Sequence, residues 1–496
     1  MPTSHDTNDA KPIPQDTLIT THHTITIDGQ EIAYTVTCGT VVLKEEAVMK
    51  GDDEGKAEGE KPRATIFFIA YTRDDVADPA NRPVTFSFNG GPGSSSVWLH
   101  MGLLGAETGL AGGGRMGAVT AVQTGGKRRA SLLDVTDLVF IDPVSTGFSR
   151  PVPGEKAQEF HNFKKDIESV GDFIRLYASR YGRWTSPKFL IGESYGTTRA
   201  AGLSGYLQER HGMFLNGIML VSIVLDFQTL EFLPGNDLPH ILYLPAFAAT
   251  AWYHGMLVDE LQSRPLREFL AEVETFAVGA CALALLQGGA LPAQLHGEIA
   301  GLLARYTSLA QDYVERSNLR IEIMRFTKEL LRDQRRTTGR LDSRYTGIDR
   351  DAAGEQFEFD PSYAAVHGPY SATFNDYVRR ELGFESDLPY EILTGLYKTW
   401  SFDDHENRFV NVAETLRKAM SMNPYLKVHV ANGLFDLATP YYAADYTVKH
   451  LGLDPSLRGN VTTSFYEAGH MMYAHRPSLL KLKAELARFI CSALPQ

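Results

Sequence analysis

A serine flanked by glycines follows an apolar run near the middle of the chain. Residues 188–197 read Lys-Phe-Leu-Ile-Gly-Glu-Ser-Tyr-Gly-Thr, which predicts a strand, a tight turn and the start of a helix. The turn would push Ser194 out at the top of a sheet, in front of a helix N-terminus. That position suits a nucleophilic hydroxyl, which needs a base, an acid that orients the base, and an oxyanion hole.

Two later residues supply the base and the acid. Ser194, Asp436 and His470 occur in the order Ser, Asp, His, which is the order of α/β-hydrolases. Each comes just after a predicted strand, and a parallel sheet collects its site residues at that edge. A neutral His470 would accept the serine proton, and Asp436 would hold the imidazole tautomer.

Other interpretations of these residues stay open at this point. Asp436 alone could cap a helix, and His470 alone could be a structural histidine. Rival bases and orienting acids exist, but none directly follows a strand: His450, His475, Asp445 and Asp454.

A glycine-rich loop follows the predicted strand 83–88 and reads Asn89-Gly90-Gly91-Pro92-Gly93. Such a loop exposes backbone N–H groups with no side chains in the way. An oxyanion hole needs two N–H donors, and we expect them from Tyr195 and Gly91. The alternative is a flexible turn, which does not require this mixture of glycine and proline.

The composition excludes several function classes. The 496 residues are 43% hydrophobic and 22% charged, with a net charge of −12, typical of a globular protein and unlike a nucleic-acid-binding one. The cysteines are Cys38, Cys281 and Cys491, too far apart for a disulfide framework or a zinc site. We therefore expect no metal, no cofactor and no nucleic-acid partner.

The expected location follows from the N-terminus and the apolar runs. The first residues are polar with no signal-type apolar region, which predicts a cytoplasmic protein in a reducing compartment. The most apolar run, residues 276–286, is shorter than the about 20 residues that a bilayer requires. We expect it to form a buried helix, and we expect no membrane partner.

Alternating strands and helices predict an α/β-hydrolase fold with a mostly parallel central sheet flanked by helices. We assign this catalytic core to residues 19–226 and 402–496. Residues 227–401 have helical patterns almost throughout, which predicts an inserted helical cap covering Ser194. Residues 1–18 are polar, contain prolines and lack periodicity, so we expect a disordered tail.

Four motifs together resemble the serine carboxypeptidase family, peptidase family S10, in a bacterial-type pattern. They are Asn89 to Ser96, Asp142-Pro143 with Gly147-Phe148-Ser149, Gly192 to Gly196, and Ala468-Gly469-His470-Met471. The resemblance implies a peptidase that removes one residue from a free C-terminus. It also implies that Asn89, Gly90 and Glu193 bind the substrate carboxylate, with Glu193 protonated. The alternative for Glu193 is an acid at a helix start.

The sequence departs from the family at part of this cluster. Eukaryotic members have tryptophan, glutamate and cysteine where this chain has Ser87, Leu103 and Ser94. An arginine fork could bind a carboxylate instead, although a solvated charged face is the alternative. The candidates lie near the end of the long helical stretch: Arg332, Arg335, Arg336, Arg340 and Arg344.

Two other functions remain open from the sequence. An esterase or acyltransferase would use the same triad, because an acyl-enzyme mechanism does not choose its leaving group. A non-catalytic binding protein could keep the fold. The preferred substrate side chain and the oligomeric state are not predicted.

Overall fold

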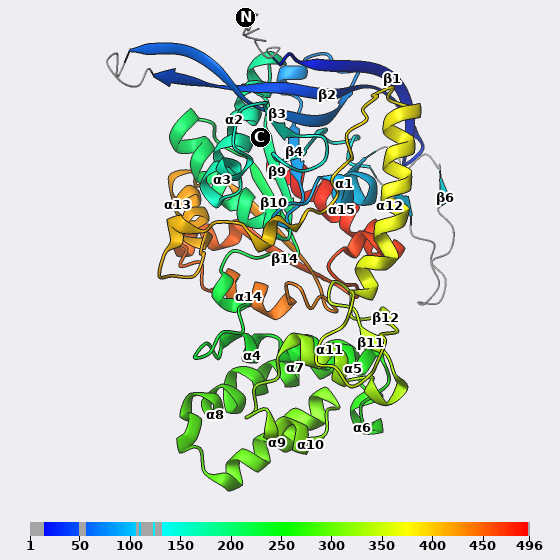
Figure 1. Ribbon diagram of the computed structural model, residues 1–496, viewed down its shortest axis with the longest axis vertical. Coiled ribbons are helices and arrows are strands. Elements are labelled where there is room, and N and C mark those ends of the chain that lie inside the picture. The colour runs from blue at the N-terminus through cyan, green and yellow to red at the C-terminus, as the bar shows by residue number, and fades with distance from the viewer. Residues whose placement is uncertain (1–13, 49–55, 106–108, 111–122, 125–130, 495–496) are drawn as a thin grey trace, which may run out of the picture.

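One ten-stranded sheet organises the computed structural model, which describes residues 14–48, 56–105, 109–110, 123–124 and 131–494 (Figure 1). The strand order is β1-β2-β3-β7-β4-β9-β10-β13-β14, and the short β8 pairs with β3. The strands are β1 (Thr17–Ile27), β2 (Gln30–Val48), β3 (Ala57–Arg73), β4 (Val84–Phe88), β7 (Asp137–Ile141), β8 (Arg150–Pro151), β9 (Lys188–Glu193), β10 (Gly217–Val221), β13 (Lys427–Gly433) and β14 (Val461–Tyr466).

The sheet is parallel from β7 to β14 and antiparallel at its N-terminal side. This arrangement confirms the predicted α/β-hydrolase fold. The predicted tail to residue 18 is too long where the structure describes it, because Thr17 and Leu18 already pair with β2. Residues 1–13 of that tail lie outside the described residues.

Helices cover both faces of the sheet because side chains alternate along each strand. On β9, Phe189 and Ile191 belong to one core cluster and Leu190 belongs to the other. The first cluster lies under α1 (Val97–Leu99), α12 (Pro361–Arg380) and α15 (Arg476–Ser492). The second lies under α2 (Phe163–Arg180), α3 (Tyr195–His211), α13 (Ala413–Met422) and α14 (Tyr441–Lys449).

A separate group of helices forms a cap at one end of the molecule, drawn in green at the bottom of Figure 1. Its apolar core includes Leu434, Phe435, Leu437 and Tyr441 from the loop and helix that follow β13. The cap therefore packs on the segment that contains Asp436. Its helices are α4 (Leu238–Leu242), α5 (Leu244–Tyr253), α6 (Asp259–Gln262), α7 (Leu266–Phe276), α8 (Ala282–Gln287), α9 (Ala293–Thr307), α10 (Gln311–Arg316) and α11 (Ile323–Glu329).

The predicted insertion 227–401 does not form one unit. Helix α12 belongs to the core, because Val366, Tyr370 and Phe374 make an apolar stripe that packs with the core cluster on the sheet. The chain returns to the core through β11 (Thr337–Thr338) and β12 (Thr346–Gly347), which lie where core and cap meet (Figure 1). Helical spacing alone could not show which body this helix joins.

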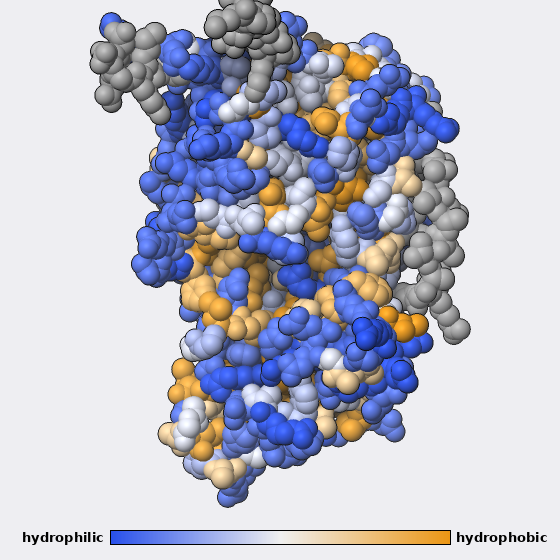
Figure 2. Space-filling model, in the orientation of Figure 1, coloured by the Kyte–Doolittle hydropathy of each residue, from blue (hydrophilic) through white to orange (hydrophobic). Residues whose placement is uncertain are grey.

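The apolar run expected to be a buried helix is partly exposed. It lies in a helical stretch from Leu266 to Ala290 that is long and apolar enough to cross a membrane and is only partly buried. The core helices of a globular protein can be equally long and apolar, and the first half of this stretch packs inside the cap. On its second half Leu283 and Leu286 are exposed, and Figure 2 shows hydrophobic residues at that end of the cap.

Candidate functional site

Ser194 occupies the sharp turn between β9 and α3. Its backbone has φ 60° and ψ −130°, a conformation that costs a residue with a Cβ about 1–3 kcal/mol. A Cβ on Gly192 would lie 2.1 Å from the carbonyl oxygen of Gly196, so the turn requires glycine there. Ser194 is partly exposed in an otherwise buried turn. The sequence thus folds locally to present one hydroxyl.

Asp436 and His470 form a buried pair. The Nδ1 atom of His470 lies 2.7 Å from Oδ2 of Asp436, and the two side chains are 5% and 0% exposed. The other carboxylate oxygen accepts the N–H groups of Ala438 (2.7 Å) and Thr439 (3.0 Å). Because the carboxylate accepts at this contact, Nδ1 holds the proton and Nε2 is the basic nitrogen.

Strand β10 links the serine turn to the histidine loop. The Ser194 N–H donates to the carbonyl of Val221 (3.0 Å), and the hydroxyl of the next residue, Ser222, donates to the carbonyl of His470 (2.7 Å). Within the described residues the Ser194 hydroxyl makes no hydrogen bond to His470. Such contacts are often looser before substrate binds. The structure thus brings the three predicted residues to one edge of the sheet.

The glycine loop after β4 lies directly against this turn. A Cβ on Gly90 would lie 2.4 Å from the backbone nitrogen of Tyr195. Gly91 has φ 104°, in the region that favours glycine. The N–H of Tyr195 begins α3 and has no acceptor in the first helical turn, and the Gly91 N–H donates to no protein acceptor among the described residues. The Tyr195 N–H therefore adjoins Ser194, and Gly90, which precedes Gly91, lies against the same turn.

A buried ion pair that sequence reasoning missed holds this loop. Arg199 donates through Nε to Oδ2 of Asp166 (2.8 Å) and through Nη1 to the carbonyl of Asn89 (2.5 Å). The Asn89 side-chain oxygen in turn accepts the N–H of Leu99 (3.0 Å). Arg199 and Asp166 are 1% and 3% exposed, so their attraction is little screened. The loop is fixed from α2, α3 and α1 together.

Glu193 is buried beside the nucleophile, and its carboxylate accepts a hydrogen bond from the hydroxyl of Tyr473 at 2.6 Å. Burial raises the pKa of Glu193 to about 7, against the charge of His470 and the hydrogen bonds of Tyr473 and Asn89, which lower it. Tyr473 is also buried. Sequence reasoning missed it, although it stands only three residues after His470.

The charges around His470 oppose one another. Burial disfavours its protonated form, but the charge and hydrogen bond of Asp436 and the charge of Glu193 outweigh burial and raise the pKa of His470. The charge of Arg340 acts in the opposite direction. The charges of two carboxyl groups and of one arginine therefore act on the pKa of His470 in opposite directions.

Asp142 holds the loops that contain Ser96 and Gly147 and does not contact the triad. Its Oδ1 accepts the N–H of Ser96 (2.8 Å), and a Cβ on Gly147 would lie 1.7 Å from its Oδ2. Burial raises the pKa of Asp142 to about 7. The Asp-Pro motif thus ties two loops together beside α1.

The rival residues have other partners. The ring of His450 contacts the carbonyl of Tyr446 (2.7 Å), and that of His475 contacts Ser478 (2.9 Å). Lys449 pairs with Asp445 (2.6 Å), and Asp454 accepts the N–H of Ser456 (2.9 Å) at the start of a short helical turn. Each of the four residues therefore has a hydrogen-bond or ion-pair partner within four positions in the chain.

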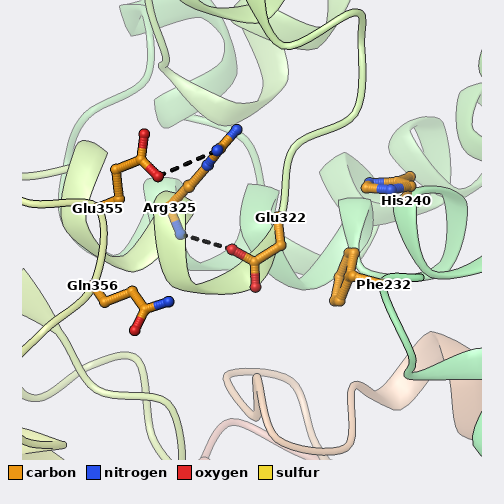
Figure 3. A pocket seen from close by; sticks show the side chains of 6 residues that line it. All are labelled: Phe232, His240, Glu322, Arg325, Glu355 and Gln356. Atoms are coloured by element: carbon orange, nitrogen blue, oxygen red, sulfur yellow. Dashed lines mark hydrogen bonds and ion pairs between the residues drawn. The ribbon is translucent and has the colours of Figure 1, made fainter. Parts of the chain in front are cut away.

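A pocket of about 290 Å³ opens in the cap (Figure 3). Figure 3 shows Arg325 between two acids: its guanidinium pairs with Glu355 (3.2 Å) and its backbone N–H donates to Glu322 (3.2 Å). Phe232 and His240 lie on the opposite side. The positive charge of this pocket is thus already paired. No residue of the pocket was predicted from the sequence as part of a site.

No group of three or more potential metal ligands occurs among the described residues. The comparisons with known proteins agree with the fold. Residues 56–226 match the family model described as serine carboxypeptidase. A search of curated proteins gives no match.

Among solved structures, the chain is similar to a prohormone-processing carboxypeptidase from Saccharomyces cerevisiae, with 15% identity, a TM-score of 0.53 and 92% of each chain covered. A carboxyl esterase from Bacillus coagulans is 12% identical, with a TM-score of 0.37, 92% of this chain covered and 99% of that one.

Proposed function

We propose that the chain is a member of the serine carboxypeptidase family, whose model matches residues 56–226, and that it releases the last residue of peptides that have a free C-terminus. The observation that carries the proposal is the buried Asp436–His470 pair beside the strained turn of Ser194. All three residues follow strands that end at one edge of the sheet, which supports a serine nucleophile with this acid and base.

The reaction follows from the roles of these atoms. Ser194 Oγ attacks the carbonyl carbon of the last peptide bond while His470 Nε2 takes the hydroxyl proton. The developing oxyanion accepts hydrogen bonds from the N–H groups of Gly91 and Tyr195. The C–N bond then breaks as His470 protonates the leaving amine, which departs as a free amino acid. Water then attacks the acyl carbon while His470 takes a proton from it. The proton passes to Ser194 Oγ as the ester bond breaks, and the shortened peptide leaves.

The terminal carboxylate of the substrate would bind at Asn89, Gly90 and Glu193. A carboxyl group donates to a carboxylate only when it is protonated, and Glu193, with a pKa of about 7, is protonated in acidic solution. The Tyr473 hydroxyl orients this carboxyl by donating a hydrogen bond to its Oε2 atom. The site can therefore read a substrate carboxylate with neutral donors.

Tyr473 supports this role where the family pattern is incomplete. Its ring lies against the backbone of Gly102, because a Cβ there would lie 2.3 Å from ring atom Cε2. Gly102 precedes Leu103, where eukaryotic members have a glutamate. A buried phenol thus lies beside the position of the missing acid and supplies a hydroxyl to the same cluster.

The pH dependence of the reaction has two opposing causes. His470 must be neutral to act as a base, which favours pH above its raised pKa. Glu193 must be protonated to bind the carboxylate, which favours pH below about 7. The two groups interact, so they titrate as a pair. We expect a bell-shaped kcat/KM for free-acid peptides and no acidic preference for small esters.

Comparison of peptides with free and amidated C-termini, from acidic to mildly alkaline pH, tests the proposal. The wild type should hydrolyse the free-acid peptide and the Ser194→Ala variant should not. Equal turnover of both peptides, or turnover of small esters alone, would favour an esterase or acyltransferase. Failure of a fluorophosphonate to label Ser194 would favour a non-catalytic protein.

The proposed location is the cytoplasm. All three cysteines are free, and Cys38 and Cys281 are buried, an arrangement that a reducing compartment preserves. Fractionation of cells that express the full chain tests this location, and recovery outside the cytoplasm contradicts it.

A further inference from the structure

Arg340 lies on a segment that passes between the loops of the catalytic acid and base. Its carbonyl accepts the N–H of Leu437 (3.0 Å), the residue after Asp436. The carbonyl of the next residue, Leu341, accepts the N–H of His470 (2.6 Å). Two backbone hydrogen bonds therefore fix the position of Arg340 relative to the catalytic pair.

The guanidinium of Arg340 is exposed and forms no ion pair or hydrogen bond with the residues that the structure describes. Two neighbouring arginines differ: Arg332 pairs with Glu329 (2.5 Å) and Arg344 with Asp342 (2.7 Å). An unpaired cation at this place is notable in a chain whose net charge is −12. Hydrogen bonds of its backbone, including one from its N–H to Oδ1 of Asp360 (3.2 Å), hold Arg340 beside the site, while its guanidinium has no carboxylate partner among the described residues.

The charge of Arg340 reaches the catalytic centre. It opposes the rise in the pKa of His470. Partial burial raises the pKa of Glu231, and Arg340 lowers it. Burial likewise raises the pKa of Tyr243, which both Arg340 and Asp436 influence in opposite directions. The guanidinium therefore lies near enough to His470, Glu231 and Tyr243 for its charge to act on the pKa of each.

On the basis of the proposed peptidase function, we propose that Arg340 binds a substrate carboxylate beside the scissile bond and so selects acidic substrates. An arginine fork recognises a carboxylate with two parallel hydrogen bonds. The terminal carboxylate already has donors at Asn89 and Glu193, so the ligand of Arg340 is an acidic side chain of one of the last two residues. Glu231, as the nearby opposite charge, weakens this preference.

The test uses free-acid peptides that differ only in Glu or Gln at each of the last two positions. We expect wild type to favour one Glu peptide by about three- to tenfold in kcat/KM, as a partly solvated charge pair allows. Arg340→Gln should abolish that ratio, and Arg340→Lys should keep part of it. Arg336→Gln, an exposed arginine on the same segment, serves as the control and should leave it unchanged. Glu231→Gln should raise the ratio.

The outcomes separate the possible ligands. If Arg340→Gln raises KM equally for Glu and Gln peptides, and amidation removes that effect, the ligand is the terminal carboxylate. If Arg340→Gln matches wild type on every peptide, the proposal is wrong. If wild type cleaves no peptide, the proposed function fails. The role of Arg340 is then tested by the ratio of kcat/KM for nitrophenyl esters of acyl-Glu and acyl-Gln, which Arg340→Gln should abolish.

Discussion

Replacement of Glu193 by glutamine tests whether a neutral carboxyl stands beside the nucleophile. The substituted side chain keeps its size and an oxygen that can accept from the Tyr473 hydroxyl, but it no longer titrates. The pKa of Glu193 rises from 4.5 to about 7 on folding, chiefly by burial. At about 1.4 kcal/mol for each tenfold change in proton affinity, this rise corresponds to about 3 kcal/mol.

The sign of the stability effect follows from proton uptake. Between pH 4.5 and about 7 the folded state keeps a proton on Glu193 that the unfolded state has lost. The free energy of unfolding of the wild type therefore falls as pH rises through this window and levels off above it. Glu193→Gln lacks this contribution, so its stability relative to wild type should increase by up to about 3 kcal/mol from pH 4.5 to 8.

Urea unfolding of both proteins at a series of pH values measures this difference. Asp142→Asn is a matched control, because Asp142 is also buried with a pKa of about 7 but does not contact the triad. Both substitutions should change the pH dependence of unfolding. Only Glu193→Gln should remove the rise in KM for free-acid peptides above pH 7. Parallel unfolding curves for wild type and Glu193→Gln at every pH would refute a neutral buried Glu193.

Three further predictions concern the nucleophile Ser194, the loop residue Gly90 and the Glu193 partner Tyr473. Ser194→Ala should lower kcat for peptides by about 10⁴-fold or more and abolish fluorophosphonate labelling; normal labelling would contradict its role. Gly90→Ala should lower kcat by about 10²-fold or more, because the new Cβ meets the Tyr195 nitrogen in the oxyanion hole, and unchanged turnover would place that hole elsewhere. Tyr473→Phe removes a hydrogen bond that lowers the pKa of Glu193. The alkaline limit of carboxylate binding should therefore move to higher pH in KM profiles, whereas a shift to lower pH would oppose this account.

Local sequence predicted the parts of the site that local geometry determines. The turn at Ser194 needs glycine on both sides, and Asp436 and His470 follow strands that end at the same edge, so each could be placed from a short window. Helix α12 could not, because its stripe of apolar residues would suit a cap helix as well as a core helix. Only the tertiary contacts show that it packs on the sheet.

Residues that act through distant partners were beyond sequence reasoning. Arg199 and Asp166 are 33 residues apart, and their value lies in a buried contact that holds Asn89. Among the five clustered arginines, only the backbone bonds of the structure show that Arg340 lies beside His470. In the sequence, all five are arginines in one charged stretch, so residue type and spacing could not single out Arg340.

The two carboxyl groups near His470 differ in their surroundings, and this difference assigns their roles. Asp436 accepts hydrogen bonds from two backbone N–H groups, the Thr439 hydroxyl and His470 Nδ1, so four donors surround its two oxygens. Glu193 is also buried and accepts hydrogen bonds from the Tyr473 phenol and the Asn89 side chain, but burial outweighs them, and its pKa of about 7 keeps it protonated in acidic solution. The first group can stabilise an imidazolium and the second can donate to a substrate carboxylate. Both acids stand at strand ends in the sequence, so only their hydrogen-bond partners distinguish orientation of the base from recognition of the substrate.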